Sequence, residues 1–303
     1  MNSRKRRCSR CLPIVFSLVI SLSLGLCLAL NRLNESELYG PYSKVLVSFV
    51  DAQGRVDYAG LQSNRHTLDG FIRDLGNISV ASWNTSAQIA FWINAYNALT
   101  LRVIVDHYPI RSSFLTSLSY PRNSIRQIDG AWDEIRFSVA GLELTLDEIE
   151  HSILRNQFTE PRIHVALVCA AQGCPVLRRE AYSGEILEKQ LQDQAARFVA
   201  DLSKVRVDSD RGLVFLSSIL SWFGRDFEEK YTPQEQVFPG RSSAQRAVLN
   251  FIFPFLTEKD QNYLRSASFR IRYLSYDWTL NQQELVRREG LECEAPFGEK
   301  PGR

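Results

Sequence analysis

The sequence predicts an α+β fold, with a single, mostly helical domain packed on a small β-sheet and an N-terminal hydrophobic helix before it. Three observations favour this class. Residues 87–107 form a long apolar stretch of helical character, residues 163–168 are β-rich and apolar, and short extended segments flank glycine-containing turns elsewhere. The chain has 303 residues, of which 45% are hydrophobic, so it is long enough to bury a sizeable core.

The first thirty residues differ in composition from the rest of the chain. Five basic residues lie in MNSRKRRCSR, and residues 11–30 form an apolar run about as long as a bilayer is thick. A basic tip before an apolar run is typical of a secretory signal or a signal anchor, and it places the following chain outside the cytoplasm. We expect residues 1–30 to be an uncleaved membrane anchor. Cleavage and lipidation are the alternatives, and each gives a membrane or extracytoplasmic location.

The charge distribution argues against a nucleic-acid partner. The formal net charge is +2, but the five basic residues of the tip account for more than this, and the remainder of the chain is at −3. No basic face follows the tip, so we expect no nucleic acid binding. Residues 31–40 are polar and predict a linker, residues 41–281 predict the folded domain, and the charged residues 282–303 predict a loosely held tail.

The first half of the domain is predicted to be helical. Helices are expected over residues 41–50, 60–75 and 87–107, the last opening at a capping-box pattern, TSAQ, and ending at Pro109. The 87–107 helix is apolar almost all round, which indicates that it is buried. Residues 112–130 are serine-rich and predicted to be irregular, and we expect them to form a flap over a site.

The second half alternates short strands and helices. A hairpin is expected over residues 134–144 around Ala140-Gly141, and a second capping box, TLDE, opens a helix that ends near residue 156. The remaining elements expected are the strands 163–168, 205–207, 213–216 and 269–276 and the helices 185–202, 218–230 and 244–256.

The segment RIHVALVCAAQGCPVL, residues 162–177, combines a predicted buried strand with a cysteine-bracketed turn. His164 is predicted to be either a core histidine or a general base or metal ligand. A turn of four small or flexible residues can bring Cys169 and Cys174 within disulfide reach. A disulfide, a nucleophilic thiolate, metal ligation and inert packing all stay open for this pair. The spacing is not a standard zinc pattern, and we expect no metal and no cofactor.

Two helices carry further polar candidates. Glu150 and His151 lie in the predicted helix that follows the hairpin and are candidates for orienting a site. Asn94 and Asn97 share one face of the long helix, with Tyr96 beside them. Buried amides must be hydrogen-bonded, so the two asparagines either hold a neighbouring loop or line a polar pocket.

Three motifs together resemble the domain-of-unknown-function family 547. They are FWINAYNALT, LTLDEIEHSILR and RIHVALVCAAQGCPVL, and GRVDYAGL and YDWTLN are similar to flanking features of the family. The resemblance extends over residues 45–281 and implies no enzyme class, because the family has no established activity. The polar residues at its motif positions are Asn94, Tyr96, Asn97, Glu150, His151, Arg155, His164, Cys169 and Cys174.

Three functions fit these residues. The first is a non-catalytic binding or structural module of the cell envelope that takes a protein, peptide or glycan ligand. The second is a thiol hydrolase or acyltransferase in which a cysteine attacks a carbonyl, His151 or His164 is the base, and an asparagine orients the site. The third is a thiol–disulfide redox protein that uses Cys169 and Cys174.

Overall fold

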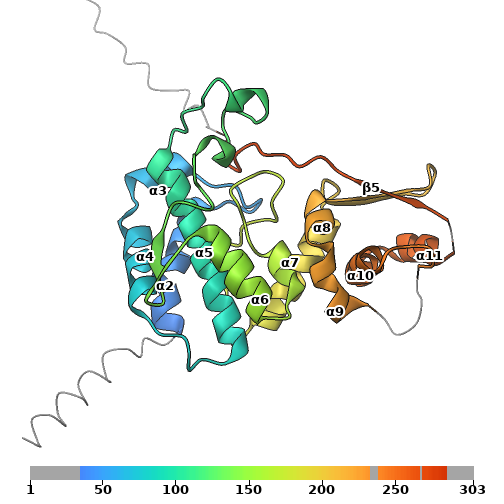
Figure 1. The fold of residues 1–303 in the computed structure, drawn as a ribbon, viewed down its shortest axis with the longest axis horizontal. Helices are drawn as coiled ribbons and strands as arrows, with labels where there is room; N and C mark the ends of the chain where they lie inside the picture. Colours follow the sequence, from blue (N-terminus) through green and yellow to red (C-terminus); the bar gives the residue numbers. More distant parts are fainter. Residues whose placement is uncertain (1–34, 233–237, 267, 285–303) are drawn as a thin grey trace, which may run out of the picture.

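The computed structural model describes residues 35–232, 238–266 and 268–284. This part of the chain is mostly helical, with short strands (Figure 1). The α-helices are α2 Glu35–Phe49, α3 Tyr58–Ser63, α4 His66–Asn77, α5 Thr85–His107, α6 Arg155–Gln157, α7 Leu187–Ala200, α8 Ser218–Trp222, α9 Glu228–Tyr231, α10 Ser243–Ile252 and α11 Glu258–Ser266. The tighter or wider helical turns are η1 Thr116–Leu118, η2 Ile125–Gln127, η3 Glu148–Leu154, η4 Pro161–Val165, η5 Gly224–Phe227 and η6 Phe253–Phe255.

Two hydrophobic clusters form the interior. The larger joins α2 to α5, the first hairpin and η3, together with part of the segment that follows η4. The smaller joins α7, the second set of strands and the helices from α8 to α11. Figure 1 shows α2 to α5 on one side and α8 to α11 on the other, with α6 and α7 between them. The molecule therefore has a junction between two packed halves.

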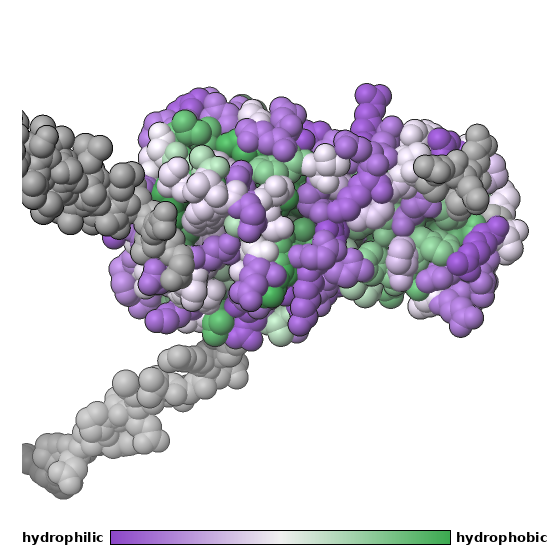
Figure 2. Space-filling view, turned by 90° about the horizontal axis from the view of Figure 1, so that it is seen from below, coloured by the Kyte–Doolittle hydropathy of each residue, from purple (hydrophilic) through white to green (hydrophobic). Residues whose placement is uncertain are grey.

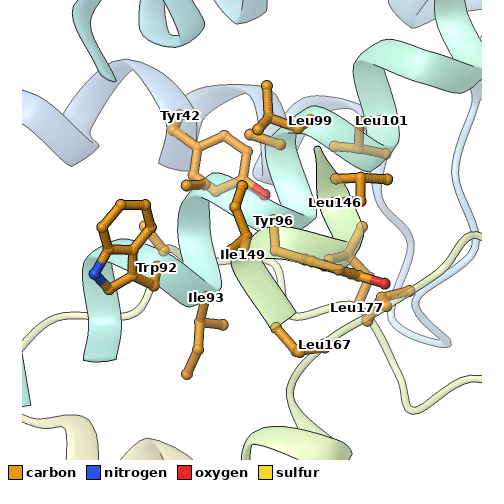
Figure 3. Packing of buried hydrophobic residues seen from close by; sticks show 14 of the residues in the cluster. Tyr42, Trp92, Ile93, Tyr96, Leu99, Leu101, Leu146, Ile149, Leu167 and Leu177 are labelled. Atoms are coloured by element: carbon orange, nitrogen blue, oxygen red, sulfur yellow. The ribbon is translucent and has the colours of Figure 1, made fainter. Parts of the chain in front are cut away.

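Helix α5 is the central helix of the larger cluster, as the sequence predicts. Its side chains are buried on nearly every face, and Asn84 caps its first turn by accepting from the backbone N–H of Ala87. The cap lies one residue before the predicted capping box. Figure 3 shows Tyr96 projecting from this helix towards the side on which Leu167 and Leu177 lie. Helix α5 thus places a polar tip, the Tyr96 hydroxyl, next to the segment that carries the cysteines.

The strands form two small sheets instead of one. β1 (Phe137–Val139) and β2 (Leu142–Leu144) are an antiparallel hairpin whose turn holds Ala140 and Gly141 at positive φ, as the glycine predicted. β3 (Val205–Asp208) and β4 (Leu213–Leu216) form a second hairpin, and β5 (Arg270–Tyr273) joins β4 in parallel. Both predicted hairpins are confirmed. The larger cluster is nevertheless a packing of helices on helices, not of helices on a sheet.

The predicted strand over residues 163–168 is wrong. Pro161 opens the 3-10 turn η4, and Glu160 caps it by accepting from the backbone N–H of Arg162. The following backbone is bonded by a side chain: Asn97 donates to the carbonyl of Ala166 and accepts from the N–H of Val168. The β-branched residues here fill the core without joining a strand ladder. Tertiary hydrogen bonds override the local β-propensity.

Several boundaries also differ from the predictions. Helix α2 begins at Glu35, so residues 35–40 are helical where a linker is predicted. Residues 60–75 contain two helices, α3 and α4, and residues 218–230 contain α8, η5 and α9. Helix α11 was not predicted. Residues 282 and 283, predicted as part of a loose tail, are bonded to the N-terminal half, since Gln283 N–H donates to the carbonyl of Val56 (2.9 Å).

The predicted anchor, residues 1–30, lies outside the described residues, as do residues 285–303. Among the helices that the structure does describe, none is long and apolar enough to cross a bilayer. The surface in Figure 2 is largely polar, with apolar side chains showing through in patches on both halves.

Candidate functional site

One cavity lies where the two hydrophobic clusters meet. It has a volume of about 460 Å³, within the range of small-molecule sites. We call it the central pocket. The residues that line it are Tyr96, Arg126, Trp132, Asp133, Asp147, Glu150, His151, His164, Leu167, Cys169, Cys174, Pro175, Ile219, Trp222, Phe223, Tyr276 and Trp278. Because these residues come from both halves, the pocket exists only while the two halves are packed together.

The cysteine turn follows η4, and neighbouring chain segments fix its path. Beyond the Asn97 contacts, the N–H of Gln172 donates to the carbonyl of Thr279 (2.7 Å). The N–H of Gly173 donates to the carbonyl of Asp277 (2.8 Å). Buried Lys204 donates from its Nζ to the carbonyl of Gln172 (2.7 Å). These hydrogen bonds satisfy backbone N–H and C=O groups of the turn that strand pairing would satisfy in a sheet.

Two positions of the turn need small side chains or unusual backbone. Ala170 has a φ of +60°, a left-handed conformation that is uncommon outside glycine. At Gly173, an added Cβ would lie 2.8 Å from ring carbons of Tyr276, so only glycine leaves room for that ring. The turn is therefore shaped to receive Tyr276.

The two cysteines are free thiols in contact with one another. Their sulfurs lie 2.9 Å apart, and the hydroxyl of Tyr276 lies 3.2 Å from Cys169 Sγ and 3.1 Å from Cys174 Sγ. The backbone N–H of Cys169 donates to Cys174 Sγ (3.0 Å). We call Cys169 and Cys174 the dithiol. Among the described residues, no hydrogen bond joins either sulfur to a histidine.

The surroundings favour a thiolate on Cys174. Burial alone would raise the pKa of its thiol, but hydrogen bonds from the Cys169 and Tyr276 side chains and from backbone N–H groups outweigh burial and lower it. The pKa of Cys169 is raised well above its ordinary value, first by its hydrogen bond to Cys174 and then by burial. Cys174 is thus the member of the dithiol that ionises more readily, and Cys169 is the member that holds its proton more tightly.

Glu150 lies on the wall of the same pocket and is 9% exposed. Burial raises the pKa of its carboxyl from 4.5 to about 7, against a hydrogen bond with Tyr96 and the charge of Arg155, which lower it. A carboxyl with such a pKa is present in both protonation states near neutral pH. It can therefore take up or release a proton under physiological conditions.

The two pocket histidines belong to a separate polar chain centred on Asp226. Asp226 Oδ2 accepts from His164 Nε2 (2.8 Å) and from Arg155 Nε (2.6 Å). Arg155 also donates from Nη1 to His151 Nδ1 (2.9 Å), which leaves the proton of neutral His151 on Nε2. Burial lowers the pKa of both histidines. In contrast, hydrogen bonds from His164 and Arg155 overcome burial and hold the pKa of Asp226 well below its usual range.

His164 has a structural environment. It is 3% exposed, its ring stacks on Phe223 at 4.0 Å between centroids, and its Nε2 is committed to Asp226. This matches the core-histidine alternative of the sequence analysis. His164 joins the two clusters because Phe223 and Asp226 both belong to the smaller half.

Aromatic side chains form the rest of the wall. Tyr276 lies 4.6 Å from Trp278 and 4.9 Å from Trp222 between ring centroids. The guanidinium of Arg126 lies 5.4 Å from the ring of Trp132 and 5.2 Å from that of Trp278, within cation–π distance. The predicted flap, residues 112–130, thus contributes Arg126 to the pocket. A wall of this kind offers flat apolar faces to a ligand.

The sequence-predicted residues divide into two groups. Tyr96, Glu150, His151, His164, Cys169 and Cys174 all line the central pocket. Asn94, Asn97 and Arg155 do not line it. Asn94 bonds both backbone groups of Tyr182, Asn97 holds the segment before the cysteine turn, and Arg155 pairs with Asp226 through two bonds. The asparagines therefore hold loops in place, one of the two alternatives expected for them.

Comparison with known protein families finds one match, over the middle of the chain. Residues 80–199 match the model of the family described as "Protein of unknown function, DUF547". This segment is therefore a DUF547 domain. Among curated proteins no match was found, and no solved structure matches.

The DUF547 match includes the dithiol, Glu150, His151 and His164, but not the whole pocket. The pocket residues Trp222, Tyr276 and Trp278 follow the matched residues, as does Asp226, which bonds to the pocket residue His164. Sequence reasoning did not single out Asp226 or Trp222, because nothing in their local spacing marks them. Tyr276 and Trp278 did lie in the motif YDWTLN, which was noted as a flanking feature, and this is the signal that could have found them.

The described residues contain no group of three or more histidine, cysteine or acidic side chains arranged to hold a metal ion. The candidate site has three components. They are the dithiol with its tyrosine, the buried carboxyl, and the aromatic wall.

Proposed function

We propose that Cys169 and Cys174 form a redox-active dithiol that reduces a disulfide bound in the central pocket. One observation carries this proposal: the two sulfurs lie in contact on the pocket wall, and both lie within hydrogen-bond distance of the Tyr276 hydroxyl. Closing a disulfide, with sulfurs about 2.05 Å apart, requires a movement of under about 1 Å from this geometry. The pair is therefore prepared for thiol–disulfide exchange.

The reaction proceeds in two displacement steps. The Cys174 thiolate attacks one sulfur of the substrate disulfide, whose S–S bond breaks and releases one thiolate. Cys169 then loses its proton and attacks Cys174 Sγ, which forms the intramolecular disulfide and releases the second substrate thiolate. Two electrons pass from the dithiol to the substrate, and an external thiol reductant returns the protein to the dithiol state.

The pocket limits the kind of disulfide that can react. Cys174 is 5% exposed and lies within a cavity of about 460 Å³. A disulfide on the surface of a folded protein does not enter such a space, whereas a small molecule or an extended peptide does. The aromatic wall favours substrates with an apolar group next to the disulfide.

A redox titration tests this function. Cys8, Cys11, Cys27 and Cys293 are first replaced by serine, so that only the dithiol remains, and the full chain is equilibrated with thiol–disulfide buffers. Alkylation and intact mass then count the free thiols. We expect both thiols to disappear together in one two-electron transition at a potential above about −300 mV. A pair that stays oxidised below that potential, or cysteines that oxidise independently, would overturn the proposal.

The contacts of the histidines make a thiol hydrolase a weaker candidate. A cysteine hydrolase needs a base within hydrogen-bond reach of its nucleophile. His164 is bonded to Asp226, and the Nδ1 of His151 accepts from Arg155. In the described part of the chain neither ring hydrogen-bonds to a sulfur, whereas the two sulfurs contact one another, which favours redox chemistry.

A binding module is the second candidate, and the aromatic wall is the observation that favours it. Such a module would take a peptide or glycan ligand and keep it without using the thiols. The double variant Cys169→Ala/Cys174→Ala separates the two functions. If it binds peptides or glycans with unchanged tryptophan-fluorescence titrations, the pocket acts as a binding site. If only disulfide-containing compounds bind, and the double variant does not react with them, the redox function is supported.

We also propose that the chain is held at a membrane or exported by its first thirty residues. The basic tip followed by the apolar run at residues 11–30 supports this location. Fractionation of cells that produce the full chain, with protease added to intact spheroplasts, tests it. We expect the protein in the membrane or outside the cytoplasm and accessible to the protease. A fully protected protein in the cytoplasmic fraction would contradict this location.

A further inference from the structure

Glu150 has no role in the two displacement steps as written, although it is a buried carboxyl that lines the same pocket as the dithiol. We propose that Glu150 accepts the proton that Cys169 releases when it closes the disulfide with Cys174. This inference rests on the proposed redox function. It assigns the second step a proton acceptor, which the dithiol itself does not contain.

Cys169 needs such an acceptor. In the reduced state its thiol donates to Cys174, and burial adds to the cost of ionising it. Once Cys174 is bound to the substrate sulfur it no longer carries a negative charge. Cys169 must then lose its proton from a partly buried position on the pocket wall. A base on the wall accelerates this step.

The other titratable groups of the pocket are less suitable. His164 and His151 are committed to Asp226 and Arg155. Burial raises the pKa of the Tyr276 hydroxyl, so it stays protonated. The carboxylates of Asp133 and Asp147 are exposed, with 44% of the Asp147 side chain accessible. Glu150 is the buried carboxyl of the pocket, and its charge acts on the Cys169 thiol.

Groups from several elements set the proton affinity of Glu150. Tyr96 on α5 bonds to its carboxylate, and Arg155, one turn further along the chain, attracts its negative charge. Asp147 on the same segment and Asp226 on η5 repel that charge. With a pKa of about 7, Glu150 is partly ionised at neutral pH. It can therefore accept a proton and later release it to solvent.

The proposed step is balanced. The Cys169 proton passes to the Glu150 carboxylate, the Cys169 thiolate attacks Cys174 Sγ, and the bond between Cys174 and the substrate sulfur breaks. The substrate sulfur leaves as a thiolate with the electron pair of that bond. Glu150 then releases its proton to solvent or to the departing thiolate.

A single-turnover reaction with dithiodipyridine tests this proton transfer. It uses the variant in which the four other cysteines are serine, so that Cys169 and Cys174 are the only thiols. This neutral aromatic disulfide releases one coloured thiopyridone when Cys174 attacks and a second when Cys169 closes the disulfide. Glu150→Gln should leave the first release within about threefold of wild type and slow the second by about 10- to 100-fold. In wild type the second rate should rise with pH through about 7, and Glu150→Gln should lose that inflection.

Two further variants keep the test decisive. Tyr96→Phe removes a bond that lowers the pKa of Glu150, so the inflection should move to higher pH in a protein that keeps the carboxyl. Glu143→Gln removes an exposed carboxyl of β2, outside the pocket, and should leave both releases unchanged. If Glu150→Gln keeps the wild-type second rate and pH profile, or if Tyr96→Phe does not shift the inflection, the role of Glu150 is refuted.

The same assay separates failure of this inference from failure of the proposed function. If the wild-type protein releases two thiopyridones and Glu150→Gln does so at the same rates, the redox function stands but Glu150 is not the proton acceptor. A wild-type protein that releases only one thiopyridone does not close its disulfide. That result overturns the redox function and, with it, this inference.

Discussion

Replacing Glu150 by glutamine should change how stability depends on pH. Burial raises the pKa of this carboxyl from 4.5 to about 7 on folding, so the folded protein binds the proton more tightly than the unfolded chain does. A raised pKa contributes stability that is fully present below the unfolded value and is lost as pH rises through the folded value. The contribution of Glu150 to stability should therefore fall by ~3 kcal/mol between about pH 4.5 and pH 7, and the comparison with glutamine isolates it from the contributions of other groups.

Glutamine is a neutral side chain of the same shape that can still accept from Tyr96. Chemical unfolding of wild type and Glu150→Gln, followed by far-UV circular dichroism from about pH 4 to about pH 8, measures the difference. We expect similar free energies of unfolding at the acidic end and a variant more stable by ~3 kcal/mol at the alkaline end. Equal pH dependence in the two proteins, or a variant less stable at high pH, would refute a buried carboxyl with a raised pKa.

Three other substitutions test the framework of the site. Asp226→Asn should lower the free energy of unfolding by about 2–4 kcal/mol in urea titrations, because His164 and Arg155 lose their carboxylate partner. This loss should shrink as pH falls, because the pKa of Asp226 is lowered in the folded protein. A loss below about 1 kcal/mol at neutral pH would contradict it. Asn97→Leu should lower the free energy of unfolding by about 2–4 kcal/mol in the same titrations, because the Ala166 carbonyl and the Val168 N–H lose their partner. An unchanged free energy of unfolding would contradict the role of Asn97 in holding this segment. Gly173→Ala should displace the Tyr276 ring and slow the first thiopyridone release severalfold. Gly70→Ala should not, because its added Cβ makes only an ordinary contact with the Arg73 side chain, 3.6 Å away. Equal rates in the two variants would contradict the packing of Tyr276 on Gly173.

The parts of the fold that the sequence predicted are those set by local pattern. Helix α5 and the two hairpins have clear periodicity or glycine turns, and the capping box at Thr145 and Glu148 is present as two reciprocal bonds. The predicted strand over residues 163–168 was wrong because β-propensity does not show which groups hydrogen-bond to this backbone in the folded protein. Its backbone is bonded by Asn97, which lies about 70 residues earlier in the chain.

The sequence predicted only those residues of the candidate site that can be recognised without knowing their tertiary partners. Glu150, Cys169 and Cys174 carry chemistry in their side chains and could be selected by type and spacing. Asp226 and Tyr276 could not, because their roles depend on how the smaller half docks against the larger. The return of residues 277–283 across the cysteine turn, which places Tyr276 on the sulfurs, leaves no mark in local periodicity.

The central claim is that Cys174 is the attacking thiolate of a dithiol that opens onto the pocket. Its most direct test compares Cys169→Ser and Cys174→Ser, each in the background without the other cysteines, after brief exposure to dithiodipyridine at neutral pH. Intact mass reports whether a stable mixed disulfide has formed. We predict rapid and complete modification of Cys174 in the first variant and little modification of Cys169 in the second. Equal reactivity, or faster reaction of Cys169, would contradict the account.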